Sequence, residues 1–147
     1  MFNKVLLPVD MQDKATAKQS LQEASHYLQS EASELHVMAV LPGLSMPVVA
    51  AYFPDDAVEK ALRALQQEVV ELIQDVLPGR EHCQVHIAEG NAAREIVTLA
   101  EKLKVDLIVM PSHNHSRVEN LLIGSVTSRV VERAHCSVMV LRNLPEK

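Results

Sequence analysis

The 147-residue sequence is poor in aromatic residues, with no Trp, two Tyr and two Phe. Its 14 Lys and Arg residues are outnumbered by 19 Asp and Glu residues, which gives a formal net charge of −5 at pH 7. A general nucleic-acid surface needs a basic patch and aromatic side chains on which bases stack. The composition therefore disfavours binding to DNA or RNA.

Long hydrophobic runs and cysteines are also scarce. No uninterrupted apolar stretch reaches the roughly 20 residues that span a bilayer. No small-residue cleavage site precedes the first strand-like run. The only cysteines, Cys83 and Cys136, are too few for a disulfide scaffold. We therefore expect a cytoplasmic protein with buried thiols and no membrane insertion.

The apolar content suffices for one core. Hydrophobic residues make up 48% of the chain and charged residues 22%, which is typical of a folded protein. A chain of this length forms one domain by default, and we expect that domain to span residues 1–147.

Short runs rich in Val, Leu, Ile and Met alternate with segments of helical periodicity. Strands are expected at Lys4 to Val9, Leu35 to Val40, Gln84 to Ala88, Val105 to Met110 and Ser137 to Leu141. Helices are expected between them, the last at Ser125 to Ala134, with a capping box at Asp56 and Glu59 and a cap at Asn91. This order predicts the α/β class: a three-layer α/β/α sandwich with an open, doubly wound, five-stranded parallel sheet.

Two features of this pattern are unusual. Pro8 cannot donate to a strand ladder, although its place near the carboxyl end of the first run softens that conflict. The connection Leu41 to Pro54 is longer and more apolar than an ordinary loop between a strand and a helix. It either covers a site as a lid or packs against the body or a partner, and packing is the commoner fate of apolar loop residues.

Ligands of open α/β sheets bind beyond the carboxyl ends of the strands, where the strand order reverses. The residues that follow the predicted strands are Asp10, Leu41, Glu89, Gly90 and Pro111 to Asn114. Further along, Gly124, Ser125, Val126 and Thr127 open a helix whose free amides and two hydroxyls favour an anion. They have the outline of a phosphate site, with an ordinary helix cap as the alternative.

Other chemistries have weaker support. A metal site would have to be collected from residues without the usual ligand spacing: His113, His115, His135 and Cys136. An esterase-like triad of Ser112 or Ser125 with His113 and Asp10 lacks the Gly-x-Ser-x-Gly turn. Neither the dinucleotide fingerprint nor the P-loop motif occurs.

Several segments together resemble the universal stress protein family. They are Lys4 to Asp10, Asp106 to Met110, Ser112-His113, Leu122 to Thr127 and Ala134 to Arg142. The resemblance covers both ends of the chain and implies the fold of the adenine nucleotide alpha hydrolase-like proteins and a homodimer. The family divides into members that bind ATP and members that do not.

The family's nucleotide signature is Gly, two residues, Gly, nine residues, Gly, and then Ser or Thr. Here the spacing is kept and Gly124-Ser125 is intact, but Pro111 and Asn114 replace the first two glycines. Pro111 has no N–H to donate, whereas Asn114 tolerates positive φ. Loss of one charge-assisted hydrogen bond weakens binding by about 1.5 to 3 kcal/mol, so a roughly micromolar site still fills at about millimolar nucleotide. The chain is most similar to an enterobacterial-type branch that has the same departure and looks nucleotide-competent.

The resemblance also implies a role for each matching residue. Asp10 corresponds to the acid on the adenine side, Val40 to the adenine wall and Met110 to the residue beneath the nucleotide. The phosphate loop corresponds to Gly124, Ser125, Val126 and Thr127, and the remaining nucleotide-binding positions are Pro8, Val9, Pro111, Ser112, His113 and Asn114. From local chemistry alone, Asp10 has a turn or helix-cap role as its alternative.

The expected function is a stress-response dimer that binds ATP, ADP or AMP, with or without Mg²⁺. The dimer would form through the strand Ser137 to Leu141, an edge that carries no Pro or Lys, and the loop Leu41 to Pro54 would signal to an unidentified protein partner. No general base for the γ-phosphate is evident, so at most slow hydrolysis or self-phosphorylation is expected. The alternative is a nucleotide-free relative, closed by Pro111 and Asn114, that acts as a protein-interaction module.

Overall fold

Strands and helices alternate along the chain in the computed structural model, which describes residues 2–28, 30, 32–42, 56–79, 83–111 and 124–142. The strands are β1 (Lys4–Pro8), β2 (Glu34–Pro42), β3 (Gln84–Gly90), β4 (Leu107–Pro111) and β5 (Ser137–Leu141). The helices are α1 (Lys14–Ser25), α3 (Ala57–Val76), α4 (Ala92–Leu103) and α5 (Ser125–Arg133). The predicted alternation of strands and helices is confirmed.

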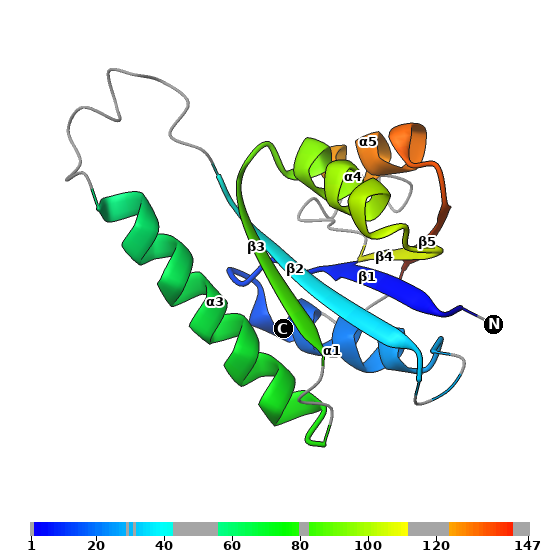
Figure 1. Cartoon of the computed structure of the whole chain (residues 1–147), viewed down its shortest axis with the longest axis horizontal. Coiled ribbons are helices and arrows are strands. Elements are labelled where there is room, and N and C mark those ends of the chain that lie inside the picture. The colour runs from blue at the N-terminus through cyan, green and yellow to red at the C-terminus, as the bar shows by residue number, and fades with distance from the viewer. Residues whose placement is uncertain are drawn as a thin grey trace.

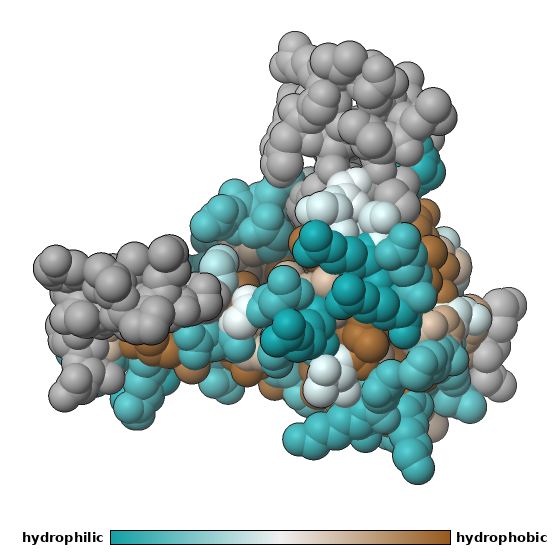
Figure 2. Space-filling model, turned by 90° about the horizontal axis from the view of Figure 1, so that it is seen from above, coloured by the Kyte–Doolittle hydropathy of each residue, from teal (hydrophilic) through white to brown (hydrophobic). Residues whose placement is uncertain are grey.

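All five strands belong to one parallel sheet of order β3-β2-β1-β4-β5. Helices α1 and α3 cover one face, and α4 and α5 cover the other (Figure 1). Viewed from the side of α4 and α5, the described residues present a mostly hydrophilic surface, because these helices turn their apolar faces toward the sheet (Figure 2). The predicted three-layer, doubly wound fold is confirmed.

Each face of the sheet has its own hydrophobic core. Neighbouring side chains of a strand point to opposite faces, so Leu7 packs with α1 and α3 while Leu6 packs with α4 and α5. Both leucines are fully buried. Burial on both faces explains why the sequences of the inner strands β1 and β4 are almost uninterrupted runs of apolar residues.

Pro8 lies in the central strand without breaking the ladder. It pairs with Met38 of β2, whereas pairing between β1 and β4 has already ended at Leu6 and Ile108. The next amide, that of Val9, donates to the Met38 carbonyl at 2.7 Å. Because successive amides of a strand point to opposite sides, the N–H that Pro8 lacks would point toward β4, beyond the end of that pairing.

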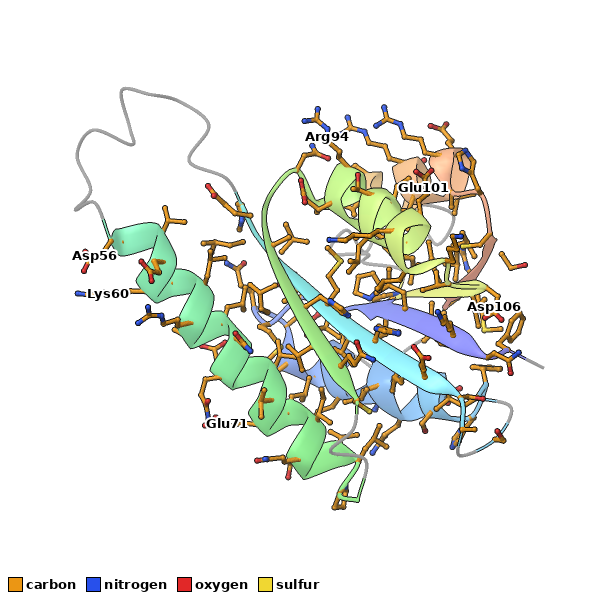
Figure 3. The ribbon with its side chains drawn as sticks, viewed as in Figure 1. Asp56, Lys60, Glu71, Arg94, Glu101 and Asp106 are labelled. Carbon is orange, nitrogen blue, oxygen red and sulfur yellow. The ribbon has the colours of Figure 1, made fainter. Side chains whose placement is uncertain are left out.

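The predicted start of α3 at Asp56 is confirmed, but the predicted capping box is not formed. Asp56 makes no side-chain cap hydrogen bond, because its backbone at φ −99° and ψ 8° departs from the extended conformation of a usual cap. Its carboxylate instead pairs with Lys60 at 3.1 Å, next to it on the first turn of α3 (Figure 3). The predicted Asn91 cap is confirmed, since the side chain accepts from the Arg94 amide at 3.0 Å.

Element ends differ from the prediction by a few residues. Strand β4 begins at Leu107 and not at Val105, because the Val105 amide donates to the Ala100 carbonyl at 3.1 Å and closes α4. Strand β2 extends to Pro42, which pairs with Gly90, so Leu41 and Pro42 belong to the sheet. The rest of the predicted loop lies outside the described residues. Within the part of the chain that the structure describes, no helix is long and apolar enough to cross a membrane.

Candidate functional site

The strand order reverses between β1 and β4. The connection after β1 leads to α1 on one face of the sheet, while β4 leads toward α5 on the other (Figure 1). Such a reversal opens a crevice at the carboxyl ends of the strands, where ligands of this architecture bind. At this position the last residues of the two strands, Pro8, Met110 and Pro111, are buried, as is Val9 directly after β1.

Asp10 follows β1 directly and is exposed. Its Oδ1 accepts from the Gln12 amide at 2.9 Å, and its carbonyl accepts from the Asp13 amide at 3.0 Å. Asp10 therefore has the turn role that the sequence offered as its alternative. Among the described residues no hydrogen bond to the other carboxylate oxygen, Oδ2, is formed.

Helix α5 begins with unpaired amides. Its first internal hydrogen bond runs from the Ser128 amide to the Gly124 carbonyl at 3.0 Å, so the amides of Ser125, Val126 and Thr127 have no partner inside the helix. Gly124 precedes them at φ 86°, a conformation that favours glycine. Ser125 and Val126 are exposed, and the helix dipole adds partial positive charge at this end.

The two hydroxyls of this helix start differ in their surroundings. Thr127 is only 1% exposed, and its Oγ1 donates to the Pro111 carbonyl at 3.2 Å. Ser125 is exposed. The Thr127 hydroxyl is therefore engaged inside the protein, whereas Ser125 and Val126 lie at the surface.

The two predicted apolar contacts of the purine lie on one face of the sheet. Met110 is buried in the core under α4 and α5, and Val40 is half-buried and packs against the same core. They occupy β4 and β2, with β1 between them. The structure thus gathers Val40, Met110, Asp10 and the start of α5 near the carboxyl edge of the sheet. Ser112, His113 and Asn114 lie outside the described residues.

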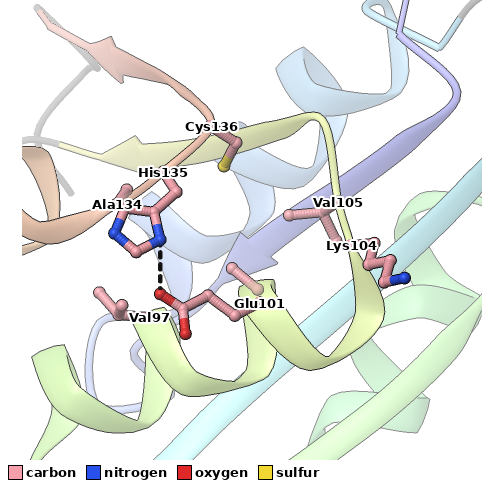
Figure 4. A pocket seen from close by; sticks show the side chains of 8 residues that line it. Val97, Glu101, Lys104, Val105, Ala134, His135 and Cys136 are labelled. Carbon is pink, nitrogen blue, oxygen red and sulfur yellow. Dashed lines mark ion pairs between the residues drawn. The ribbon is translucent and has the colours of Figure 1, made fainter.

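A surface hollow of about 280 Å³ lies at the other end of the sheet, where β4 and β5 begin (Figure 4). His135 Nδ1 pairs with Glu101 Oε2 at 2.8 Å across its rim. Burial, with a smaller contribution from the Asp106 carboxylate, raises the pKa of the Cys136 thiol, which disfavours the reactive thiolate. Sequence reasoning missed this hollow because its lining residues come from distant segments.

A chain of polar contacts centred on buried His36 joins β2 and β3, and sequence reasoning missed it too. His36 is 2% exposed; its Nδ1 lies 2.9 Å from His86 Nε2, and its Nε2 lies 2.9 Å from Glu34 Oε1. Burial lowers the pKa of His86, and the neighbouring His36 and Lys102 lower it further. The one indication of this contact in the sequence was the position of His36 in a predicted strand, where its side chain would point inward. Among the described residues, no three His, Cys, Asp or Glu side chains are arranged so that they could hold a metal ion.

Known proteins match the chain over nearly its whole length. The model of the universal stress protein family matches residues 1–142. Universal stress protein MJ0531 of Methanocaldococcus jannaschii is 32% identical over 153 residues, which cover 100% of this chain and 85% of that protein.

Solved structures share the fold. The hypothetical protein MJ0577 superimposes with a TM-score of 0.76 and 26% identity over 99% of both chains. A universal stress protein in complex with cAMP gives a TM-score of 0.58 and 18% identity over 96% of this chain and 97% of that one. A universal stress protein from Archaeoglobus fulgidus in complex with dAMP gives a TM-score of 0.56 and 17% identity over 95% and 97%.

Proposed function

The chain belongs to the universal stress protein family, and from that premise we propose that it binds an adenine nucleotide and acts in stress responses without rapid catalytic turnover. The observation that carries this proposal is the exposed start of α5, with its unpaired amides, at the edge of the sheet where the strand order reverses between β1 and β4. The ligand is ATP, ADP or AMP, with or without Mg²⁺. Two proteins with this fold were solved with cAMP and dAMP, which supports the adenine class.

The residues at the start of α5 fit a phosphate. The amides of Ser125, Val126 and Thr127 have no partner inside the helix, and the helix dipole favours a negative charge beside them. The exposed Ser125 hydroxyl supplies a further donor. None of these groups takes a proton from water at neutral pH, which is why we propose a binding site without rapid hydrolysis.

The other end of the site fits the base and sugar. Asp10 Oδ2 is an acceptor for an exocyclic amine or a ribose hydroxyl. Half-buried Val40 supplies apolar surface on the face of the sheet that α5 covers, where Met110 lies buried in the same core, and such a surface suits the flat side of a purine. We propose that Asp10 orients the nucleotide while α5 holds its phosphates.

The first test is whether the purified protein carries a nucleotide. We expect mass spectrometry of the denatured protein to detect a released adenine nucleotide and added ATP to raise the melting temperature. Asp10→Ala should weaken affinity about ten- to a hundredfold, the equivalent of one charge-assisted hydrogen bond. Glu68→Ala, which removes an exposed carboxylate on α3, should bind like the parent.

Gly124→Asp tests the anion site directly, because it places a carboxylate where the phosphates are proposed to lie. Gly79→Asp is its matched control: Gly79 also has positive φ, at 94°, but no atom within 4 Å of an added Cβ. ATP should raise the melting temperature of the Gly79 variant and leave that of the Gly124 variant unchanged. No released nucleotide and no ATP-dependent shift in the parent protein would favour a protein-interaction module instead.

We also propose that the protein forms a homodimer through β5. This strand lies at the end of the sheet order and pairs with β4 on one side. It contains neither Pro nor Lys to discourage strand addition, and its middle residues are only half-buried. A symmetric copy would cover this edge. Sedimentation equilibrium at micromolar concentration should give twice the 16.3 kDa chain mass, and a monomer there would contradict the proposal.

A further inference from the structure

A buried hydrogen bond ties the end of β4 to the first turn of α5. Thr127 Oγ1 donates to the carbonyl of Pro111, 16 residues earlier, at 3.2 Å, and Thr127 is 1% exposed. Pro111 is also buried. A buried hydroxyl is normally hydrogen-bonded, so this contact satisfies Thr127 within the protein and leaves no need for a ligand there.

The contact also fixes what Thr127 can offer a nucleotide. A hydroxyl has a single proton to donate, and that proton is committed to the Pro111 carbonyl. What faces solvent at this helix start is the exposed pair Ser125 and Val126. The same hydrogen bond gives Pro111 a role that needs no N–H, since it uses only the carbonyl of the residue that stands in the place of a glycine.

We propose that Thr127 is a positioning residue of the nucleotide site, whose hydroxyl holds the start of α5 against the end of β4 so that the free amides face the crevice. The inference rests on the proposed function. In this arrangement the phosphates bind to the backbone amides of Ser125 and Val126. Thr127 does not contact them and acts through its hydrogen bond to the Pro111 carbonyl. Affinity then depends on a side chain that touches no ligand.

Thr127→Val tests the proposal, because it keeps the shape of the side chain and removes the donor. Calorimetric titration should show about three- to tenfold weaker binding of both AMP and ATP, the equivalent of one neutral hydrogen bond. Thr127→Ser keeps the hydroxyl and should bind within about twofold of the parent. Should the Val variant fail to fold, Thr127→Cys, with its weak donor, should bind less tightly than the Ser variant.

Ser20→Ala is the matched control. Ser20 is fully buried in α1, and its hydroxyl also donates to a main-chain carbonyl, that of Thr16. The Ala variant loses a comparable hydrogen bond far from the proposed site. It should melt at a lower temperature and bind AMP and ATP like the parent, which separates positioning from general loss of stability.

Hydrogen exchange of the free protein supplies a readout without nucleotide. The Ser128 amide, which makes the first hydrogen bond of α5, should exchange faster in Thr127→Val than in the parent, the Ser variant or Ser20→Ala. Unchanged exchange with weaker binding would identify Thr127 as a direct ligand and overturn the inference. So would parent-like affinity of Thr127→Val. If the parent itself binds no nucleotide, the proposed function fails first, and Ser128 exchange alone decides whether the hydroxyl holds the helix start.

Discussion

At the scale of single residues, Lys104 occupies a conformation that usually belongs to glycine. Its φ of 58° is the only positive value of a non-glycine residue in the described part of the chain. Its amide donates to the Glu101 carbonyl at 3.3 Å, and the next amide, of Val105, donates to Ala100. This pattern terminates α4 and turns the chain toward β4, and it costs an L-residue about 1 to 2 kcal/mol.

Lys104→Gly should therefore stabilise the protein. Relief of the left-handed conformation exceeds the added entropy of glycine in the unfolded chain, so we expect a net gain of up to about 1 kcal/mol in the free energy of unfolding. Urea denaturation measures it. Lys102→Gly, inside α4, should lower stability by about 1 kcal/mol. A loss of stability in Lys104→Gly would show that the Lys side chain matters more than its backbone.

His86 should make the protein acid-sensitive. Its pKa in the folded protein is lowered by burial, by His36 and by Lys102, so the unfolded chain binds a proton at higher pH than the folded one. Stability from this group is present above the ordinary His value of about 6.5 and is lost as the pH falls toward the lower folded value. The free energy of unfolding should decline in that window and decline less in His86→Gln. His26→Gln, at an exposed position, should decline like the parent.

At the scale of elements, Asp106 joins the start of β1 to the start of β4. Its Oδ1 accepts from the Lys4 amide and its Oδ2 from the Asn3 amide, both at 3.0 Å. The Asp106 amide in turn donates to the Lys4 carbonyl at 3.0 Å, and Lys4 Nζ donates to the Leu103 carbonyl at 3.2 Å. Figure 3 shows Asp106 near the first residues of the chain. Asp106 begins one of the segments that resemble the universal stress protein family. These hydrogen bonds explain structurally why an acidic residue stands at that position.

Asp106→Ala should destabilise the fold by about 2 to 3 kcal/mol, because two charge-assisted hydrogen bonds at a partly exposed site are lost together. Asp106→Asn keeps one acceptor and should cost about half as much. Thermal and urea unfolding measure both. The Ala variant should also lower the pKa of the Cys136 thiol, since Asp106 adds to the effect of burial there; an unchanged thiol titration would contradict that contribution.

Helix α3 shows which features of a helix follow from its local sequence and which do not. Its apolar spacing predicts a long amphipathic helix, and the structure contains 20 helical residues there. Asp56 occupies the predicted N-cap position, but the capping box is absent: the Asp56 carboxylate pairs with Lys60, and Glu59 pairs with Arg63. Existence of the helix follows from periodicity over many residues, whereas each side-chain partner depends on the backbone angles of one residue and on neighbours competing for it.

At the scale of the whole molecule, the sheet separates two cores. Ile73 of α3 packs in one and Ile96 of α4 in the other, at 4% and 2% exposure. Side chains on opposite faces of the sheet share no partner, so their contributions to stability should be independent.

The substitutions Ile73→Val and Ile96→Val should each cost about 0.5 to 1.5 kcal/mol. Their double variant should equal the sum within about 0.5 kcal/mol. Ile96→Val with Ile108→Val, both in the core beneath α4 and α5, should depart further from additivity. Urea denaturation of the six proteins measures both cycles, and strong coupling between Ile73 and Ile96 would show that the two cores behave as one.

The sequence by itself determined the alternation of strands and helices, the parallel sheet and the family. Periodicity and apolar runs are local properties that the chain displays directly, and the segments that carry the resemblance are contiguous. It also indicated Asp10 and the start of α5, because residues after parallel strands meet at one edge.

Only the tertiary structure decided which polar groups are buried and hydrogen-bonded within the protein and which stay exposed. The sequence assigns two hydroxyls to the helix start, but folding buries one of them, Thr127, against Pro111 and leaves Ser125 exposed. The His36–His86 contact and the hollow beside Cys136 likewise join residues that lie far apart in the chain. Burial and hydrogen-bond pairing depend on which surfaces pack together, and no single segment contains that information.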